Sequence, residues 1–166
     1  MSQLLAVLAL AVSDRVRDAA VSASRQDGAG PAALVHLHAY PGGSVIDLQH
    51  VVRLTQTGAV RLVERLVDAG LVERRAGRDR RTHALWLTAS GSEAVGQILV
   101  ERAAAVAPVL QDLAPADAAT LERLLERLVA GLADDRPGAL TVCRLCDRES
   151  CCSGPGCPLA HTGARP

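Results

Sequence analysis

The stretch LTQTGAVRLVERLVDAGLVERRAGRDRRTHALWL, residues 54–87, fixes the fold class of this chain. Its first half carries apolar residues at the spacing of one helix face, namely Val60, Val63, Leu66 and Val67. Gly70 then supplies a helix stop. Residues 71–75 and 82–87 are predicted strands on either side of a polar, glycine-containing turn. A helix followed by an arginine-rich hairpin predicts a winged helix.

The segments before this stretch complete a helix-turn-helix. Pro31 suits the first turn of a helix that reaches about Tyr40, and the following Pro-Gly-Gly is a turn. Ser44 is the expected cap of a second short helix, and Thr55 is the expected cap of the third. Two helices joined by a tight turn, then a third helix and a basic hairpin, are the order that a winged helix-turn-helix requires.

Long amphipathic helices flank this region. They are predicted over residues 2–25, from residue 88 onward with a kink or break at Pro108, and from Pro115 to about Leu132. Their apolar faces exceed what a small winged domain buries, so a helical dimer interface is expected, with a monomeric bundle as the alternative. The expected fold is mainly α with a small β-wing (α+β). Its parts are a helical dimerisation region (1–30 and 88–133), a winged helix-turn-helix (31–87), and a linker with a cysteine-rich metal-binding tail (134–166).

Charge and composition favour duplex DNA as the partner. Residues 53–81 hold eight arginines against four acids, a net charge of +4 in a chain whose total is zero, and the chain has no lysine. Guanidinium groups grip phosphate or a guanine edge with two hydrogen bonds. Because Tyr40 and Trp86 are the only aromatic residues, the stacking platforms that single strands need are lacking.

The third helix is expected to read the major groove. Gln56 suits adenine and Arg61 suits guanine, while Thr55 and Arg65 are placed at phosphates and Gly58 allows close backbone approach. Arginines at the hairpin tip are expected in a minor groove, with an aspartate orienting one of them. The predicted DNA-binding residues are Thr55, Gln56, Thr57, Gly58, Arg61, Arg65, Arg78, Asp79, Arg80 and Arg81.

These residues resemble the MarR family of dimeric winged-helix transcriptional regulators. The specific motifs are LTQTGAVRLVERLVDAGLVERR and GRDRRTHALWLTASG, and a looser likeness in helix order covers residues 2–133. The resemblance implies a homodimer on a pseudopalindromic operator that usually represses nearby genes, with no catalytic activity. It also implies a small-molecule effector, although no residue here specifies one. Two positions depart from the family pattern. Position 60 is Val, where the family often has a small hydroxyl residue, and position 114 is Ala, where a capping residue often precedes the final helix.

The C-terminal tail forms a second predicted site. Cys143 and Cys146 have the spacing of a metal knuckle, and three more cysteines follow closely. The expected ligands are Cys143, Cys146, Cys151 and Cys157, with Cys152 and His161 as alternates. Four thiolates suit structural zinc, which is preferred, or a 4Fe-4S cluster. Disulfide switching and an inert reduced tail are the competing interpretations.

A metal or redox state at the tail is one expected signal for the regulator. Two other functions are weighed against it: a thiol-based oxidoreductase or metal carrier that uses the tail, and a winged-helix protein-interaction module. The apolar segment 4–12 lacks a basic start and is too short to cross a membrane, so a cytoplasmic protein without a membrane partner is expected.

Overall fold

The computed structural model describes residues 2–76, 83–153 and 156–163. Its elements in chain order are α1 (Ser2–Ser24), α2 (Gly30–Ala39), α3 (Val45–Val52), α4 (Gln56–Asp68), β1 (Val72–Ala76), β2 (His83–Leu87), α5 (Ala89–Leu110), α6 (Pro115–Ala130), α7 (Arg136–Val142), α8 (Arg148–Ser153) and the 3-10 helix η1 (Ala160–Thr162). The predicted fold class, mainly α with a small β-wing, is confirmed. No described helix is long and apolar enough to cross a membrane.

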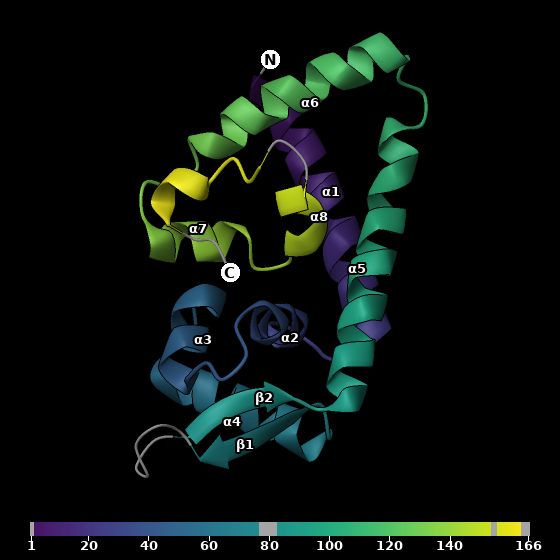
Figure 1. Cartoon of the computed structure of the whole chain (residues 1–166). Helices are drawn as coiled ribbons and strands as arrows, with labels where there is room; N and C mark the ends of the chain where they lie inside the picture. Colours follow the sequence, from purple (N-terminus) through teal and green to yellow (C-terminus); the bar gives the residue numbers. More distant parts are fainter. Residues whose placement is uncertain (1, 77–82, 154–155, 164–166) are drawn as a thin grey trace.

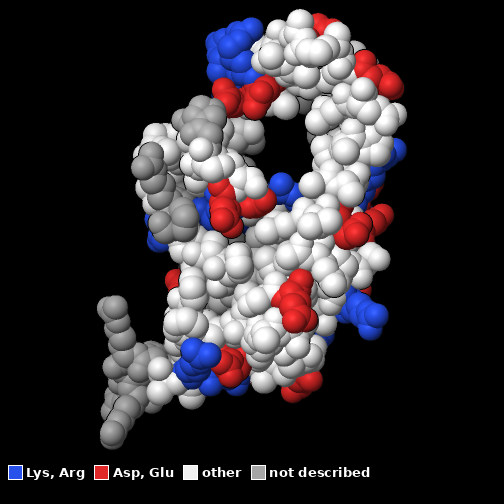
Figure 2. All heavy atoms as spheres, turned by 45° about the vertical axis from the view of Figure 1, so that its right-hand side comes forward, with Lys and Arg blue, Asp and Glu red and all other residues white. Residues whose placement is uncertain are grey.

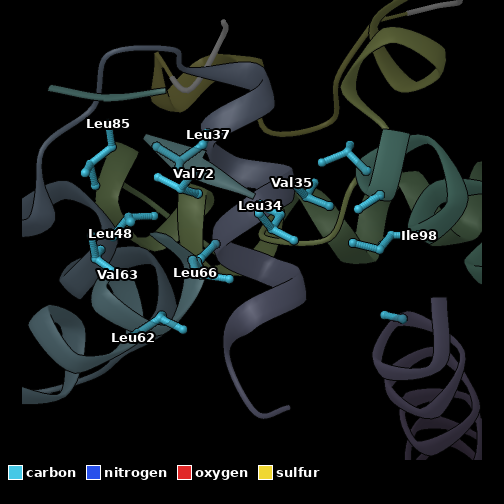
Figure 3. Close-up of a cluster of buried hydrophobic side chains, with 14 residues drawn as sticks. Leu34, Val35, Leu37, Leu48, Leu62, Val63, Leu66, Val72, Leu85 and Ile98 are labelled. Carbon is cyan, nitrogen blue, oxygen red and sulfur yellow. The ribbon is translucent and has the colours of Figure 1, made fainter. Parts of the chain in front are cut away.

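The winged helix-turn-helix, which we call the head (residues 30–87), has one apolar core. The wing strands pair antiparallel, with Val72 opposite Leu87 and Ala76 opposite His83. Side chains from every element of the head meet in the core, and Ile98 joins them from α5 (Figure 3). The fully buried members with large side chains are Leu34, Leu37, Leu48, Leu62, Leu66, Leu85 and Ile98. The large side chains of the head core are therefore aliphatic.

The predicted helix starts are confirmed by their caps. Ser44 and Asp47 form a reciprocal capping box at α3. The Thr55 hydroxyl accepts a hydrogen bond from the Gly58 amide, at 3.2 Å, and so caps α4. At α5 the Thr88 hydroxyl accepts from the Gly91 amide at 3.0 Å and donates to the Gly70 carbonyl at 2.7 Å. Thr88 thus connects the start of α5 to the turn that follows α4.

Helices α1, α5 and α6 form an arm that extends away from the head. Helix α1 packs along α5, whereas no residue of α6 is buried. Figure 2 shows an opening through the molecule beneath α6, between α5 and the C-terminal region. A kink or a break was predicted at Pro108. Helix α5 continues through Pro108 to Leu110, so of these two the break is wrong. Proline lacks the N–H that would bond to the carbonyl four residues earlier, so the preceding turn loses one hydrogen bond, and the helix ends two residues after Pro108.

The segment predicted as a linker belongs to a folded unit. Asp135 caps α7 through the Gly138 amide, at 2.8 Å, so the helix begins inside the expected linker. Residues 131–163, which we call the C-terminal lobe, have a small core of Ala133, Ala139 and Leu159. From the sequence, Pro137 indicated a linker, but proline is also favoured in the first turn of a helix, where Pro137 lies. The lobe lies between α6 and α3 (Figure 1).

His36 is a buried histidine on α2, and we expect it to make the protein acid-sensitive. Burial, and then the neighbouring Arg148, lower the pKa of His36 from 6.5 to about 4, with Arg136 acting in the same direction and Asp47 opposing them. Between these pH values the unfolded chain binds a proton that the folded chain excludes. The stabilisation from neutral His36 is therefore present at neutral pH and is lost as pH falls from 6.5 toward 4, by about 3 kcal/mol.

Urea unfolding at several pH values measures this effect in wild type and in a His36→Gln variant. The variant should lose stability less steeply with acid. His38→Gln is the matched control, because His38 lies two residues along the same helix and is exposed. Equal acid sensitivity of wild type and the His36 variant would contradict the assignment.

Candidate DNA-binding surface and cysteine cluster

Helix α4 presents a polar face at its N-terminal end. Gln56, Thr57 and Arg61 are all exposed, as the sequence predicted. The opposite face is anchored by four buried residues, Ala59, Leu62, Val63 and Leu66. This stripe is turned slightly from the predicted one, because small Ala59 and large Leu62 enter the core while Val60 and Val67 are only half-buried. The exposed face is thus held rigidly on a packed helix.

Two predicted DNA-binding residues have structural partners. Gly58 lies in the first turn of α4, where its amide completes the Thr55 cap. Arg65 lies in the last turn of α4, and its guanidinium donates a hydrogen bond to the Asp27 carbonyl at 3.4 Å. Arg65 therefore connects α4 to the loop before α2. To make its predicted phosphate contact, the Arg65 side chain must leave this hydrogen bond.

The predicted wing-tip residues Arg78, Asp79, Arg80 and Arg81 lie outside the described residues. The base of the wing is well defined. Leu85 exchanges two backbone hydrogen bonds of 2.9 Å with the turn between α2 and α3, at Gly42 and Gly43. The Arg75 guanidinium forms an ion pair with Glu73 and lies 4.8 Å from the centre of the Trp86 ring. The hairpin is thereby fixed to the helix-turn-helix, a contact that the sequence pattern did not reveal.

All five cysteines lie in the C-terminal lobe, where the four predicted ligands and Cys152 act on one another electrostatically. The Cys146 thiol donates a hydrogen bond to the Asp147 carbonyl at 3.6 Å, and Cys143 and Cys151 lie near enough to act on its pKa. Cys157 is close enough for its charge to act on Cys143 and Cys151. We call Cys143, Cys146, Cys151 and Cys157 the cysteine cluster. All five cysteines are free thiols.

Local structure brings the cluster together. The Cys146 amide donates to the Cys143 carbonyl at 2.9 Å, which closes the knuckle that the C-x-x-C spacing predicts. Asp147 then accepts hydrogen bonds from the Ser150 amide and hydroxyl, at 3.1 and 2.6 Å, and so orients α8, which carries Cys151. Cys157 packs against the core of the lobe.

The thiols shift one another's acidity. The hydrogen bond from Cys146 lowers the pKa of Cys143, and the same bond raises the pKa of Cys146. Burial, and then the neighbouring Cys146, raise the pKa of Cys151 to about 12. Negative charge is thus favoured on Cys143 and disfavoured on its two neighbours.

The two alternate ligands differ in their surroundings, although the charge of Cys152 also acts on Cys151. Cys152 is exposed. The ring nitrogens of His161 lie 3.3 Å from the Pro158 carbonyl and 3.2 Å from the Ala133 carbonyl, so this ring is engaged with the backbone of the lobe. Among the described residues, no three His, Cys, Asp or Glu side chains converge on one point as metal ligands do.

Two tail arginines contact the head in a way that sequence reasoning missed. The guanidinium groups of Arg136 and Arg148 lie 5.6 and 4.9 Å from the centre of the Tyr40 ring, at the end of α2. A shallow cavity of about 420 Å³ between Tyr40, Arg136 and Leu140 marks where the lobe meets the head. That Tyr40 is the chain's only tyrosine was visible in the sequence, but nothing there indicated its partners.

The fold and the α4 surface define a winged helix-turn-helix protein with a helical arm. The fold is that of MarR family regulators. Rv1404 from Mycobacterium tuberculosis matches with a TM-score of 0.71 and 21% identity, over 80% of this chain and 92% of that one. A MarR family protein from Bacillus stearothermophilus gives a TM-score of 0.67 and 24% identity, over 76% and 89%.

A third similar structure is the M. tuberculosis MarR family protein Rv2887 in complex with DNA. Its TM-score is 0.61 and its identity 25%, over 77% of this chain and 96% of that one. No protein family model matches this sequence. No curated protein matches it either.

Proposed function

We propose that this protein is a sequence-specific transcriptional regulator that binds double-stranded DNA. The observation that carries the proposal is the capped N-terminal half of α4, whose exposed Gln56, Thr57 and Arg61 project from a helix held by buried residues on its other face. A rigid helix with short polar side chains and one arginine suits the major groove. The likeness to a regulator solved with DNA supports the same function.

We propose that the regulator acts as a homodimer. The arm exposes apolar side chains from α1 and α6, including Leu4 at 77%, Leu128 at 56% and Leu132 at 62% exposure. Exposed leucines in such number mark an interaction surface. A second copy fits because the same face then covers itself around a two-fold axis. Two heads related in this way bind a pseudopalindromic operator.

We propose that the regulator is a repressor, because a dimer bound to an operator obstructs transcription of the adjacent gene. The predicted cytoplasmic location fits this activity, because the operator is chromosomal.

The alternative function is that the winged helix binds another protein instead of DNA. The salt dependence of binding distinguishes the two functions, because a protein that neutralises several phosphates loses DNA affinity steeply as salt rises. Operator fragments selected from random duplexes are the probe, and affinity that is flat in salt would overturn the proposal.

Replacement of Arg61 tests the reading helix directly. Arg61→Ala should cost about 1–3 kcal/mol of operator affinity per head and relax preference at one base position in each half-site. Binding of the variant to operators with each base at each position measures both effects. Arg15→Ala, which removes an exposed arginine from α1, is the control and should bind as wild type. Uniform weakening across all sequences would make Arg61 a phosphate contact instead.

A further inference from the structure

The C-terminal lobe contacts the head at several points. Thr141 of α7 is buried, and its hydroxyl lies 3.4 Å from the His50 carbonyl of α3. The guanidinium groups of Arg136 and Arg148 lie over the Tyr40 ring at the end of α2. The lobe is therefore docked on two helices of the head, so that a rotation of the head away from the lobe would break these contacts.

The same lobe is attached to the arm. Arg102 of α5 donates a hydrogen bond to the Leu145 carbonyl, and Val129 of α6 packs against the core of the lobe. The chain also runs from the end of α6 directly into the lobe. Head, α5, α6 and lobe therefore form a closed ring (Figure 1).

The two attachments meet at one residue, Leu145. Its side chain packs against the core of the head, and its carbonyl accepts the hydrogen bond from Arg102. Ile98 is the last buried residue of α5, so Arg102 lies one helical turn beyond the part of α5 that the head encloses. A helix that is held at one end only is free to swing about that end, and a second attachment further along removes this freedom.

We propose that the C-terminal lobe fixes the orientation of the head relative to the arm, and that Arg102 and Leu145 are positioning residues that thereby determine which half-site spacing the dimer accepts. This inference rests on the proposed function, because spacing matters only if two joined heads bind DNA. The two residues act at a distance, since the exposed polar residues that we propose read the operator lie on α4.

The link between orientation and spacing is geometric. In the proposed dimer the two arms are joined, so the distance and angle between the heads depend on how each head is fixed to its own arm. Half-sites of a dimeric regulator lie about 34–36 Å apart, and one added base pair moves the second half-site by about 3.4 Å and turns it by about 35°. A head held by the lobe cannot follow this displacement without distortion of protein or DNA. A head released from the lobe can follow it.

Operators whose half-sites are moved apart or together by one base pair test the inference. Wild type should prefer one spacing and bind the neighbouring ones about tenfold or more weakly, because the DNA must then be twisted to fit. Arg102→Ala removes the hydrogen bond to the Leu145 carbonyl, and Leu145→Ala removes the packing on the head. Each variant should reduce the difference between spacings to about threefold or less, while affinity for a single half-site stays as in wild type.

Glu101→Ala is the matched control, because Glu101 precedes Arg102 on α5 and is exposed. It should keep the spacing preference of wild type. The same preference in wild type and both variants would overturn the inference, as would a wild type without any preference. Equal weakening on every operator and on the single half-site would show that the two residues only support the fold of the head, and would overturn it too.

Hydrogen exchange tests the attachment of the lobe without DNA. Arg102→Ala and Leu145→Ala should speed amide exchange in α7 but not in α4, because the lobe loosens while the core of the head stays packed. Unchanged exchange in α7 would overturn the attachment. If wild type binds no duplex DNA, the proposed function fails and the role in spacing fails with it, whereas the exchange rates still decide whether the lobe holds the head.

Discussion

Glutamate in place of Leu128 should leave the protein monomeric. Leu128 lies on α6, a helix with no buried residue, among exposed leucines at helical spacing. A dimer would bury it from both copies, and each buried leucine contributes roughly 1.5–3 kcal/mol. A carboxylate placed there twice must be desolvated without a partner, which opposes association. Sedimentation should show the mass of one chain, and operator affinity should fall about 100-fold or more because each head then binds its half-site alone.

The control for this variant is Ala119→Glu. Ala119 is exposed on the opposite face of the same helix, so the variant adds the same charge outside the leucine stripe. It should remain dimeric and bind the operator as wild type does. A dimeric Leu128→Glu protein would contradict the proposed interface, and circular dichroism confirms that the helices remain folded in both variants.

Alanine at Gly91 should destabilise the protein by about 3 kcal/mol, a large effect for one methyl group. A β-carbon at this position would lie 2.0 Å from the Leu71 carbonyl oxygen, so backbone must move. That same carbonyl accepts a hydrogen bond from the Thr88 amide at 3.1 Å. Movement of Leu71 therefore also disturbs the cap that joins α4, the wing and α5. Urea unfolding monitored by circular dichroism measures the loss.

Gly96 on the same helix provides the comparison. A β-carbon at Gly96 would meet nothing within 4 Å, so Gly96→Ala should gain the roughly 0.5–1 kcal/mol by which alanine exceeds glycine in a helix. The two variants add the same atom to the same helix with opposite expected signs. A Gly91→Ala protein as stable as wild type would show that Gly91 and Leu71 are not in close contact.

The LTASG motif illustrates how much of the structure could be predicted from the sequence. The sequence placed a helix start at Thr88, and the cap is confirmed. It also marked Gly91 as part of a family motif, but gave no reason for the glycine. The reason is the approach of Leu71, seventeen peptide bonds earlier than Thr88, which only the folded chain brings against the helix. The C-x-x-C segment is a second case, since spacing marked its cysteines, and only the folded chain shows that the Leu145 carbonyl between them accepts a hydrogen bond from Arg102 of α5.

Residue patterns alone were sufficient for the head, its caps at Ser44 and Thr55, its two strands and the polar face of α4. These features depend on interactions between residues a few positions apart, which helix and strand periodicity record. The tertiary structure was needed for the bridge of Leu145 to Arg102, the attachment of Arg65 to Asp27, and the stacking of two tail arginines on Tyr40. Such contacts join residues far apart in the chain, and no periodic pattern encodes them, because they depend on how whole elements pack.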